Sequence, residues 1–252
     1  MTSVLAMADC GVVLGGRRVI SGVSLEVRGG EVVGVLGANG GGKTTLLRAA
    51  LGLARLTSGQ VRLGGCPIGE LTEARRAALA AYLPQDRRVG WNLPAWRIVA
   101  LGLPLISPSR ARPNTLAALG SVGAEDLAER GILDMSGGER ARVLIARLIV
   151  TGAPLLIADE PAAGLDPEAQ FQVMEVLRTR AALGAAVLVS LHDLTLAARC
   201  CDRVVVLGQG RMLADGPPAA TLTPDLLASA FALDGALIPS AMGHVLAARR
   251  LR

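Results

Sequence analysis

Short apolar runs and stretches of helical spacing follow one another along most of this chain. Apolar runs bounded by glycine or proline predict strands at residues 31–36, 60–63, 81–85, 154–161, 186–191 and 203–207. Apolar positions three and four residues apart predict helices over residues 44–53, 71–80, 136–150, 168–183, 194–201 and 226–233. Because strands alternate with helices, the pattern predicts an α/β fold with a mainly parallel sheet.

Two regions depart from this alternation. Residues 12–27 alternate in polarity and are rich in β-branched residues, which predicts two strands of a small sheet that turns at Gly15-Gly16. The region from residue 86 to residue 134 contains both tryptophans and several prolines, and its helical patches lie at residues 95–101, 115–119 and 124–130. We interpret residues 86–150, approximately, as a helical insert within one domain of residues 1–235, which leaves a tail of residues 236–252.

The strand at residues 31–36 leads directly into a glycine-rich loop and then into a helix. The loop fits the pattern G-x-x-x-x-G-K-[ST] of the Walker A phosphate-binding loop, and its residues are Gly37, Ala38, Asn39, Gly40, Gly41, Gly42, Lys43, Thr44 and Thr45. Lys43 is the only lysine in a chain whose other cationic residues are arginines, and a compact ammonium fits between two phosphates where a planar guanidinium does not. A glycine-rich turn with a stray lysine is the alternative, but the surrounding strand and helix favour nucleotide binding.

Charged and titratable side chains follow two of the predicted buried strands. Asp159 and Glu160 end the apolar run at residues 154–161, and His192 follows the run at residues 186–191. Carboxylates at the carboxyl end of a parallel strand are typical of a metal-binding and catalytic site at that edge of a sheet. The alternatives are a solvated strand end for the two carboxylates and a structural or surface histidine for His192.

The helix predicted at residues 136–150 begins with an S-x-x-E capping box formed by Ser136 and Glu139. An ordinary helix cap would explain these two residues. Gly137 and Gly138 in the first turn would each cost about 1 kcal/mol relative to alanine. We therefore expect another group to approach this backbone closely.

The composition limits the class of protein further. The chain is 51% hydrophobic but only 2% aromatic, so Ala, Leu and Val must form the core, and its net charge is +5. The arginines are spread along the chain without the interleaved aromatics that stack on bases, so we expect solvated surface first, a nearby membrane second and no nucleic acid. The four cysteines lack C-x-x-C spacing and are expected to be reduced thiols. We expect neither a signal peptide nor a membrane-spanning helix, so any membrane role would require a partner.

Taken in order, these motifs resemble the ATP-binding cassette (ABC) ATPases. The resemblance extends from Val4 to Leu233, and the residues that carry it are the Walker A loop, Tyr82-Leu83-Pro84-Gln85, Ser136-Gly137-Gly138-Glu139, the run ending in Asp159-Glu160, Gly164-Leu165-Asp166 and His192. It implies a P-loop NTPase with a mainly parallel core sheet, a small antiparallel β-subdomain and an inserted helical subdomain. It also implies ATP and Mg²⁺ as ligands.

The resemblance implies a role for each motif. Residues 37–42 would wrap the phosphates and Lys43 would bridge the β- and γ-phosphates, while Thr44, Asp159 and Gln85 would hold or contact Mg²⁺. Glu160 would be the general base or would position the attacking water, and His192 would contact the γ-phosphate. Ser136, Gly137, Gly138 and Glu139 would bind ATP held by a second copy of the chain, with Asp166 at the same interface of a head-to-tail homodimer.

Three positions differ from the usual pattern of this family. The family usually has an aromatic residue that stacks on adenine, but here Leu14 occupies the corresponding position and no aromatic residue precedes Tyr82. Adenine would then rest on an aliphatic surface or on an arginine such as Arg17 or Arg18. Gly41 replaces the usual Ser or Ala, and Met135 replaces the usual Leu, both of which look tolerable.

Further segments resemble the ATPases of iron–siderophore, haem and cobalamin importers, namely residues 82–85, 99–102, 191–198, 216–218 and 222–224. This resemblance implies an ATPase subunit on the cytoplasmic face of the inner membrane. Its partners would be a transmembrane permease and, indirectly, a substrate-binding protein. The alternatives are an ATPase of another importer or exporter, a soluble cassette protein acting on DNA or ribosomes, and a cassette that binds ATP only as a switch. None of these residues would contact the cargo, so the sequence does not name it.

Overall fold

A six-stranded sheet forms the centre of the computed structural model, which describes residues 3–104 and 107–251. In spatial order its strands are β10 (Arg211–Gly216), β9 (Arg203–Gly208), β3 (Val32–Gly37), β8 (Ala186–Ser190), β7 (Leu155–Asp159) and β6 (Ala80–Leu83). Each neighbouring pair is parallel except β10 and β9, which are antiparallel. The predicted α/β fold with a mainly parallel sheet is therefore confirmed.

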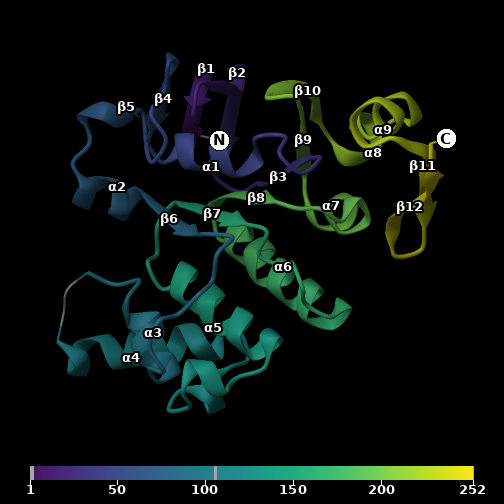
Figure 1. Ribbon diagram of the computed structural model, residues 1–252. Helices are drawn as coiled ribbons and strands as arrows, with labels where there is room; N and C mark the ends of the chain where they lie inside the picture. The colour runs from purple at the N-terminus through teal and green to yellow at the C-terminus, as the bar shows by residue number, and fades with distance from the viewer. Residues whose placement is uncertain (1–2, 105–106, 252) are drawn as a thin grey trace.

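A second, antiparallel sheet covers one face of this core sheet (Figure 1). Its strands are β2 (Arg17–Arg28), β1 (Ser3–Leu14), β4 (Ser58–Leu63) and β5 (Cys66–Pro67). Helix α1 (Lys43–Ala50) lies between the two sheets and contacts strands of both. Fully buried side chains such as Leu5, Leu46 and Ile157 form one apolar cluster across this layer. The cluster fixes the start of α1, where the phosphate-binding loop ends.

Helices cover the opposite face of the core sheet. Among the helices that contact the sheet are α5 (Gly137–Ile149), α6 (Pro167–Ala182) and α7 (Leu194–Cys200). With α3 (Ala95–Ala100) and α4 (Pro108–Gly120), α5 also forms the helical subdomain at the bottom of Figure 1. A short helix, α2 (Glu73–Leu79), precedes β6, and single 3₁₀ turns lie at Ile68–Glu70, Glu125–Leu127 and Ile132–Asp134. None of the helices in the described part of the chain combines the length and apolar character needed to cross a membrane.

The helix predicted over residues 124–130 is wrong, because only a single 3₁₀ turn forms there. The carbonyl groups of Ala128 and Arg130 accept hydrogen bonds from the amides of Trp96 and Ala95, at 3.1 and 3.0 Å. These two bonds join the end of the segment to the first turn of α3. Within the segment, the amides of Leu127, Ala128 and Arg130 donate to carbonyls three residues earlier, which is the hydrogen-bond pattern of a 3₁₀ turn and not of an α-helix.

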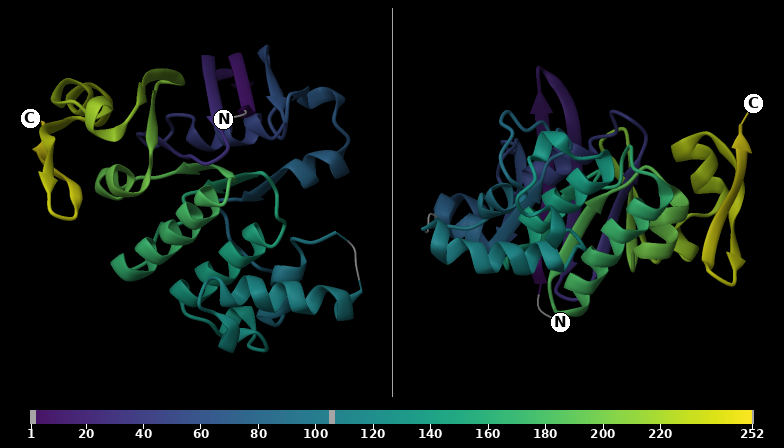
Figure 2. Two further views of the ribbon diagram at one scale, coloured as in Figure 1. Left: turned by 180° about the vertical axis from the view of Figure 1, so that it is seen from behind. Right: turned by 90° about the horizontal axis from the view of Figure 1, so that it is seen from below.

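The C-terminal residues form structure that the sequence reading did not include. After β10 and helices α8 (Pro218–Thr221) and α9 (Pro224–Phe231), strands β11 (Leu233–Ser240) and β12 (Gly243–Arg250) pair as an antiparallel hairpin. Figure 2 shows this hairpin at one end of the molecule. The Leu246 amide donates to Thr195 Oγ1 of α7 at 3.1 Å. The division at residue 235 stays a prediction, although the hairpin begins just before it.

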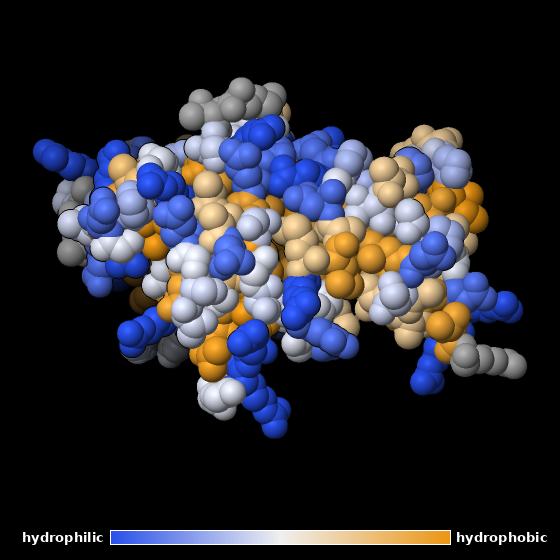
Figure 3. Space-filling view, turned by 90° about the horizontal axis from the view of Figure 1, so that it is seen from above, coloured by the Kyte–Doolittle hydropathy of each residue, from blue (hydrophilic) through white to orange (hydrophobic). Residues whose placement is uncertain are grey.

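The surface over the two sheets is mostly hydrophilic, as the view from above shows (Figure 3). Hydrophobic side chains gather toward the end formed by α9 and the hairpin. Among the exposed large hydrophobic residues of this end are Ile238 and Met242.

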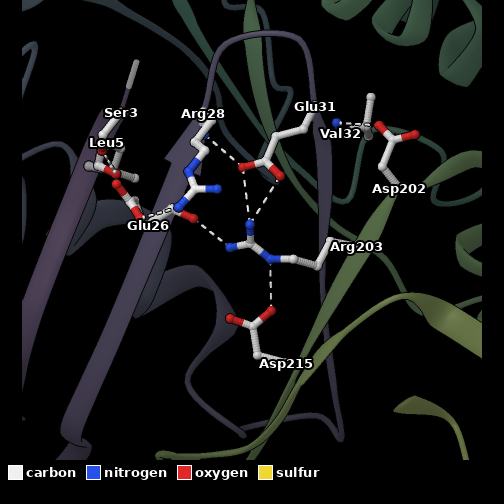
Figure 4. Close-up of polar contacts among 9 residues, drawn as sticks. All are labelled: Ser3, Leu5, Glu26, Arg28, Glu31, Val32, Asp202, Arg203 and Asp215. Atoms are coloured by element: carbon white, nitrogen blue, oxygen red, sulfur yellow. Dashed lines mark hydrogen bonds and ion pairs between the residues drawn. The ribbon is translucent and has the colours of Figure 1, made fainter. Parts of the chain in front are cut away.

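Arg203 at the start of β9 joins the two sheets through a cluster of acidic groups (Figure 4). Its guanidinium contacts Glu31 Oε1 and Oε2 at 3.1 and 3.0 Å, Asp215 Oδ1 at 2.8 Å and the backbone carbonyl of Glu26 on β2. The side chains of Arg203 and Glu31 are only 22% and 17% exposed. Removing one partner of such a mostly buried pair leaves the remaining charges without compensation.

Replacing Arg203 with methionine is therefore expected to lower the free energy of unfolding by about 2–3 kcal/mol. Arg28→Met is the matched control, because its ion pair with Glu26 is about half exposed and should contribute less than about 1 kcal/mol. Urea unfolding of both variants measures the difference. Equal effects of the two substitutions would contradict the proposed role of the cluster.

Candidate functional site

The phosphate-binding loop joins β3 to α1 at the carboxyl edge of the core sheet. Gly42 caps α1 with a left-handed φ of 99°, and a Cβ there would lie 2.7 Å from Ile20 Cδ1 and 3.0 Å from the Val19 carbonyl oxygen. A side chain at position 42 would therefore push the loop away from β2. Glycine keeps the first amides of α1 close to the cavity described below.

The side chain of Lys43 lies within its own loop and is only 5% exposed. Its Nζ donates to the carbonyl oxygens of Gly37 at 2.9 Å and Ala38 at 3.4 Å. Burial lowers the pKa of the Lys43 ammonium, and the nearby carboxylates of Glu160 and Asp159 act in the opposite direction. The ammonium is thus held at the carboxyl edge of the sheet, close to two acidic groups.

A cavity of about 450 Å³ opens beside this loop. The residues that line it are Val19, Asn39, Gly40, Gly41, Gly42, Lys43, Thr44, Thr45, Gln85, Glu160 and His192. They come from β2, the loop after β3, the loop after β6 and the ends of β7 and β8. The fold therefore brings four separately predicted motifs to one cavity, because parallel strands present their carboxyl ends at the same edge.

Asp159, at the end of β7, has one committed and one free carboxylate oxygen. The residue is completely buried, and its Oδ1 accepts a hydrogen bond from Ser190 Oγ at 2.6 Å. Its Oδ2 is buried without a hydrogen-bond partner among the residues that the structure describes. Burial raises the pKa of nearby Tyr82 to about 12, and the negative charge of Asp159 acts in the same direction. A buried carboxylate oxygen without a hydrogen-bond partner fits a hard divalent cation such as Mg²⁺, although Asp159 is not among the residues that line the cavity.

Glu160 is 8% exposed and is contacted on its side chain and its backbone. Gln85 Nε2 donates to Glu160 Oε2 at 2.9 Å, and His192 Nε2 contacts Glu160 Oε1. Ser190 Oγ accepts from the Glu160 amide at 2.8 Å, and Arg87 donates to the Glu160 carbonyl. The carboxylate lines the cavity directly, where it can accept a proton from a bound water.

Sequence reasoning missed Ser190 and Arg87. Ser190 ends a strand predicted as apolar, and its position two residues before His192 was the available signal. Arg87 lies two residues after Gln85 in a chain with many arginines, so its type carried no information. Their partners lie 30 and 73 residues away.

The predicted capping box at the start of α5 is confirmed. The Glu139 amide donates to Ser136 Oγ at 3.2 Å, and the Ser136 amide donates to Glu139 Oε2 at 2.8 Å. The hydrogen bond from the Ser136 amide lowers the pKa of Glu139. Ser136, Gly137, Gly138 and Glu139 are not among the residues that line the 450 Å³ cavity. Within one chain the two predicted halves of the site are therefore separate.

The fold gives Asp166 a local contact. It caps the N-terminus of α6, where its Oδ1 accepts from the Ala169 amide at 2.9 Å. A helix cap accounts for its position without a ligand.

An aliphatic and cationic surface adjoins the loop where adenine is expected. Leu14 at the end of β1 is 50% exposed, and Arg17 and Arg18 at the start of β2 are also exposed. Val19 lines the cavity itself. Support of the adenine by Leu14, Arg17 or Arg18 stays a prediction.

Comparisons with known proteins show the family to which the chain belongs. A family model described as ABC transporter matches residues 20–163. The hemin import ATP-binding protein HmuV of Rhodococcus jostii (strain RHA1) is 42% identical over 220 residues, which is 86% of this chain and 75% of that protein. The cobalamin import ATP-binding protein BtuD of Halobacterium salinarum (strain ATCC 29341 / DSM 671 / R1) is 39% identical over 228 residues, covering 87% of this chain and 56% of that protein.

A solved structure titled as a metal-chelate type ABC transporter in an inward-facing conformation is also similar. It superposes with a TM-score of 0.85 over 100% of this chain and 98% of that chain, at 22% identity. Identity at this level shows the fold alone. The similarity extends over the C-terminal hairpin as well as the core.

Proposed function

The chain belongs to the ABC transporter family, and from this premise we propose that it is the ATP-hydrolysing subunit of an importer for haem, cobalamin or an iron–siderophore complex. The observation that carries the proposal is the single cavity that joins Lys43, Gln85, Glu160 and His192. The cargo class rests on the names of the relatives, which are import ATPases for hemin and cobalamin.

The cavity supplies the groups that phosphoryl transfer to water requires. The amides of the phosphate-binding loop and the Lys43 ammonium would neutralise and orient the phosphates, which is the main part of catalysis for this reaction. His192 would contact the γ-phosphate and hold the carboxylate of Glu160 on its other side. Glu160 would orient the attacking water and accept its proton.

Thr44, Asp159 and Gln85 are the residues proposed to hold or contact Mg²⁺. The free Oδ2 of Asp159 is the strongest support for this assignment. When bound, the cation neutralises charge that develops on the β- and γ-phosphate oxygens. Gln85 already donates to Glu160 in the described structure, so it links the loop after β6 to the proposed base.

The same proposal includes a second copy of the chain, whose Ser136 to Glu139 segment would complete each site. Gly137 supports it, because its φ is not positive and a Cβ there would meet no atom within 4 Å. Nothing within the described chain therefore requires glycine at this position, although glycine in a helix costs about 1 kcal/mol. A phosphate approaching the exposed first turn of α5 from another copy would require it.

Replacing Ser136 with arginine is expected to abolish ATP-driven dimerisation, because a long cation would occupy the first turn of α5. Light scattering with ATP and Mg²⁺, using the Glu160→Gln background to prevent turnover, measures the mass. Ser229→Arg, on the exposed side of α9, is the matched control and should still dimerise. Unchanged dimerisation of the Ser136 variant would count against the shared site.

We propose that the permease contacts the loop that begins at Gln85. Trp91 in this loop is 76% exposed, so its large apolar surface is available to a partner. A contact there would reach the site through Gln85 and Glu160. The subunit would then lie on the cytoplasmic face of the inner membrane, attached through its partner.

Reconstitution with a cognate permease and with candidate substrate-binding proteins tests the function. We expect ATP hydrolysis to rise when one binding protein is loaded with its ligand. Haem, cobalamin and a ferric siderophore are compared in separate vesicles, and uptake is measured in each. If an unrelated solute stimulated ATP hydrolysis, or if none of the three ligands did, the cargo class would be overturned. The ATPase assignment would not be affected.

A further inference from the structure

Glu160 has an unusual backbone conformation for the residue proposed as the base. Its φ is 51°, in the left-handed region that residues with a side chain adopt at a steric cost. Such a conformation persists only where surrounding contacts hold it. Because the Cα–Cβ direction follows from the backbone, this conformation also determines where the carboxylate points.

Ser190 contacts the amide side of Glu160. Ser190 pairs with Asp159 in the parallel register of β8 and β7, and it is completely buried. The Glu160 amide donates to Ser190 Oγ at 2.8 Å, and that hydroxyl is 2.6 Å from Asp159 Oδ1. An amide can only donate, so the Ser190 hydroxyl proton is directed to the Asp159 carboxylate. One hydroxyl therefore fixes the Glu160 amide and one oxygen of Asp159.

Arg87 contacts the carbonyl side of the same residue. Its Nη2 donates to the Glu160 backbone carbonyl from the loop after β6. The Arg87 side chain is partly buried, and the next arginine along the chain, Arg88, is 93% exposed and contacts only Asp86 among the described residues. Burial lowers the pKa of Arg87, and the Glu160 carboxylate opposes that change, as expected for a cation close to it. The two arginines thus share a loop but have different surroundings.

We propose that Ser190 and Arg87 are positioning residues, which hold the amide and the carbonyl of Glu160 and so keep its carboxylate directed into the cavity. The inference rests on the role proposed above for Glu160. Gln85 and His192 contact only the side chain of Glu160, so they cannot replace these backbone contacts. Arg87 and Gln85 also belong to one loop, which therefore contacts both the backbone and the carboxylate of the base.

The first experiment measures kcat and KM for ATP in Ser190→Ala and Arg87→Met, together with the stoichiometry of binding of a fluorescent ATP analogue. We expect kcat per binding site to fall about 10–100-fold, in the range found when partners of site ligands are removed, with little change in KM. Loss of folded protein alone would lower the number of binding sites and leave kcat per site unchanged, which would overturn the proposal.

Two matched controls test whether the loss of activity depends on contact with Glu160 and not merely on the type of residue removed. Arg88→Met removes the neighbouring exposed arginine, and Thr115→Val removes another completely buried hydroxyl, which donates to the Arg112 carbonyl at 2.8 Å. Both should retain kcat per site. If either control lost as much activity as its partner variant, the effect would not belong to Glu160. Should Ser190→Ala not fold, Arg87→Met decides the question alone.

The second experiment repeats Arg87→Met in the Glu160→Gln background under single-turnover conditions. Because Arg87 is proposed to act through the Glu160 carboxylate, the second substitution should add no more than about a twofold loss. A full additional loss would show that Arg87 acts elsewhere and would overturn the inference. An inactive wild-type protein, or a fully active Glu160→Gln variant, would instead overturn the proposed function.

Discussion

Glu160→Gln is expected to bind ATP nearly as well as the unchanged protein and to hydrolyse it about 10²–10⁴-fold more slowly. The amide keeps the size of the side chain but cannot accept a proton from water. The proposed phosphate contacts of the loop at residues 37–45 are not changed by the substitution. Multiple-turnover phosphate release and equilibrium binding of an ATP analogue measure the two effects separately.

A matched substitution tests whether this loss belongs to the site. Glu70→Gln makes the same chemical change at an exposed position and should leave turnover unchanged. Near-normal turnover of Glu160→Gln would reject the role of this carboxylate as base or water-positioner. A loss of binding as large as the loss of turnover would show instead that Glu160 mainly supports the loop.

Lys43→Arg is expected to lower ATP turnover by about 10²–10³-fold, the effect of removing one preorganised group that stabilises transition-state charge. Positive charge is kept, so the loss would arise from shape. Lys43 as a residue is only 5% exposed, and its Nζ lies 2.9 Å from the Gly37 carbonyl oxygen. A planar guanidinium is wider and cannot point one compact charge between two phosphates.

Arg48→Lys is the matched control for this prediction. Arg48 lies on the same helix, is exposed, and undergoes the reverse exchange between the two cations. Its turnover and binding should not change. If Lys43→Arg kept most of the activity, the argument from the compact ammonium would be contradicted, because any cation would then suffice.

Several motifs of the site are defined by local sequence alone. The phosphate-binding loop, the strand ending in Asp159 and Glu160, and the capping box at Ser136 depend on neighbours within a few residues. The periodicity also predicted the mainly parallel sheet, since strands alternated with helices. Given that sheet, the meeting of Lys43, Glu160 and His192 at one edge followed from geometry.

Local sequence could not predict elements whose hydrogen bonds come from distant residues. The hairpin from Leu233 to Arg250 depends on packing against α7, and the segment at residues 124–130 forms one 3₁₀ turn whose end is hydrogen-bonded to the start of α3. For the same reason β10, in which polar and apolar residues are mixed, was not predicted. Its pairing with β9 gives it its place in the core sheet.

The sequence by itself therefore determined the motif residues that line the cavity, the alternation of strands and helices in the core, and the family. Only the tertiary structure decided how the groups are held. It gave Glu160 its left-handed backbone, directed the Ser190 hydroxyl to Asp159, and placed Arg87 instead of Arg88 against the Glu160 carbonyl. Hydrogen bonds are short and directional, so partners 30 to 73 residues apart in the chain are identified only after the strands have brought them together.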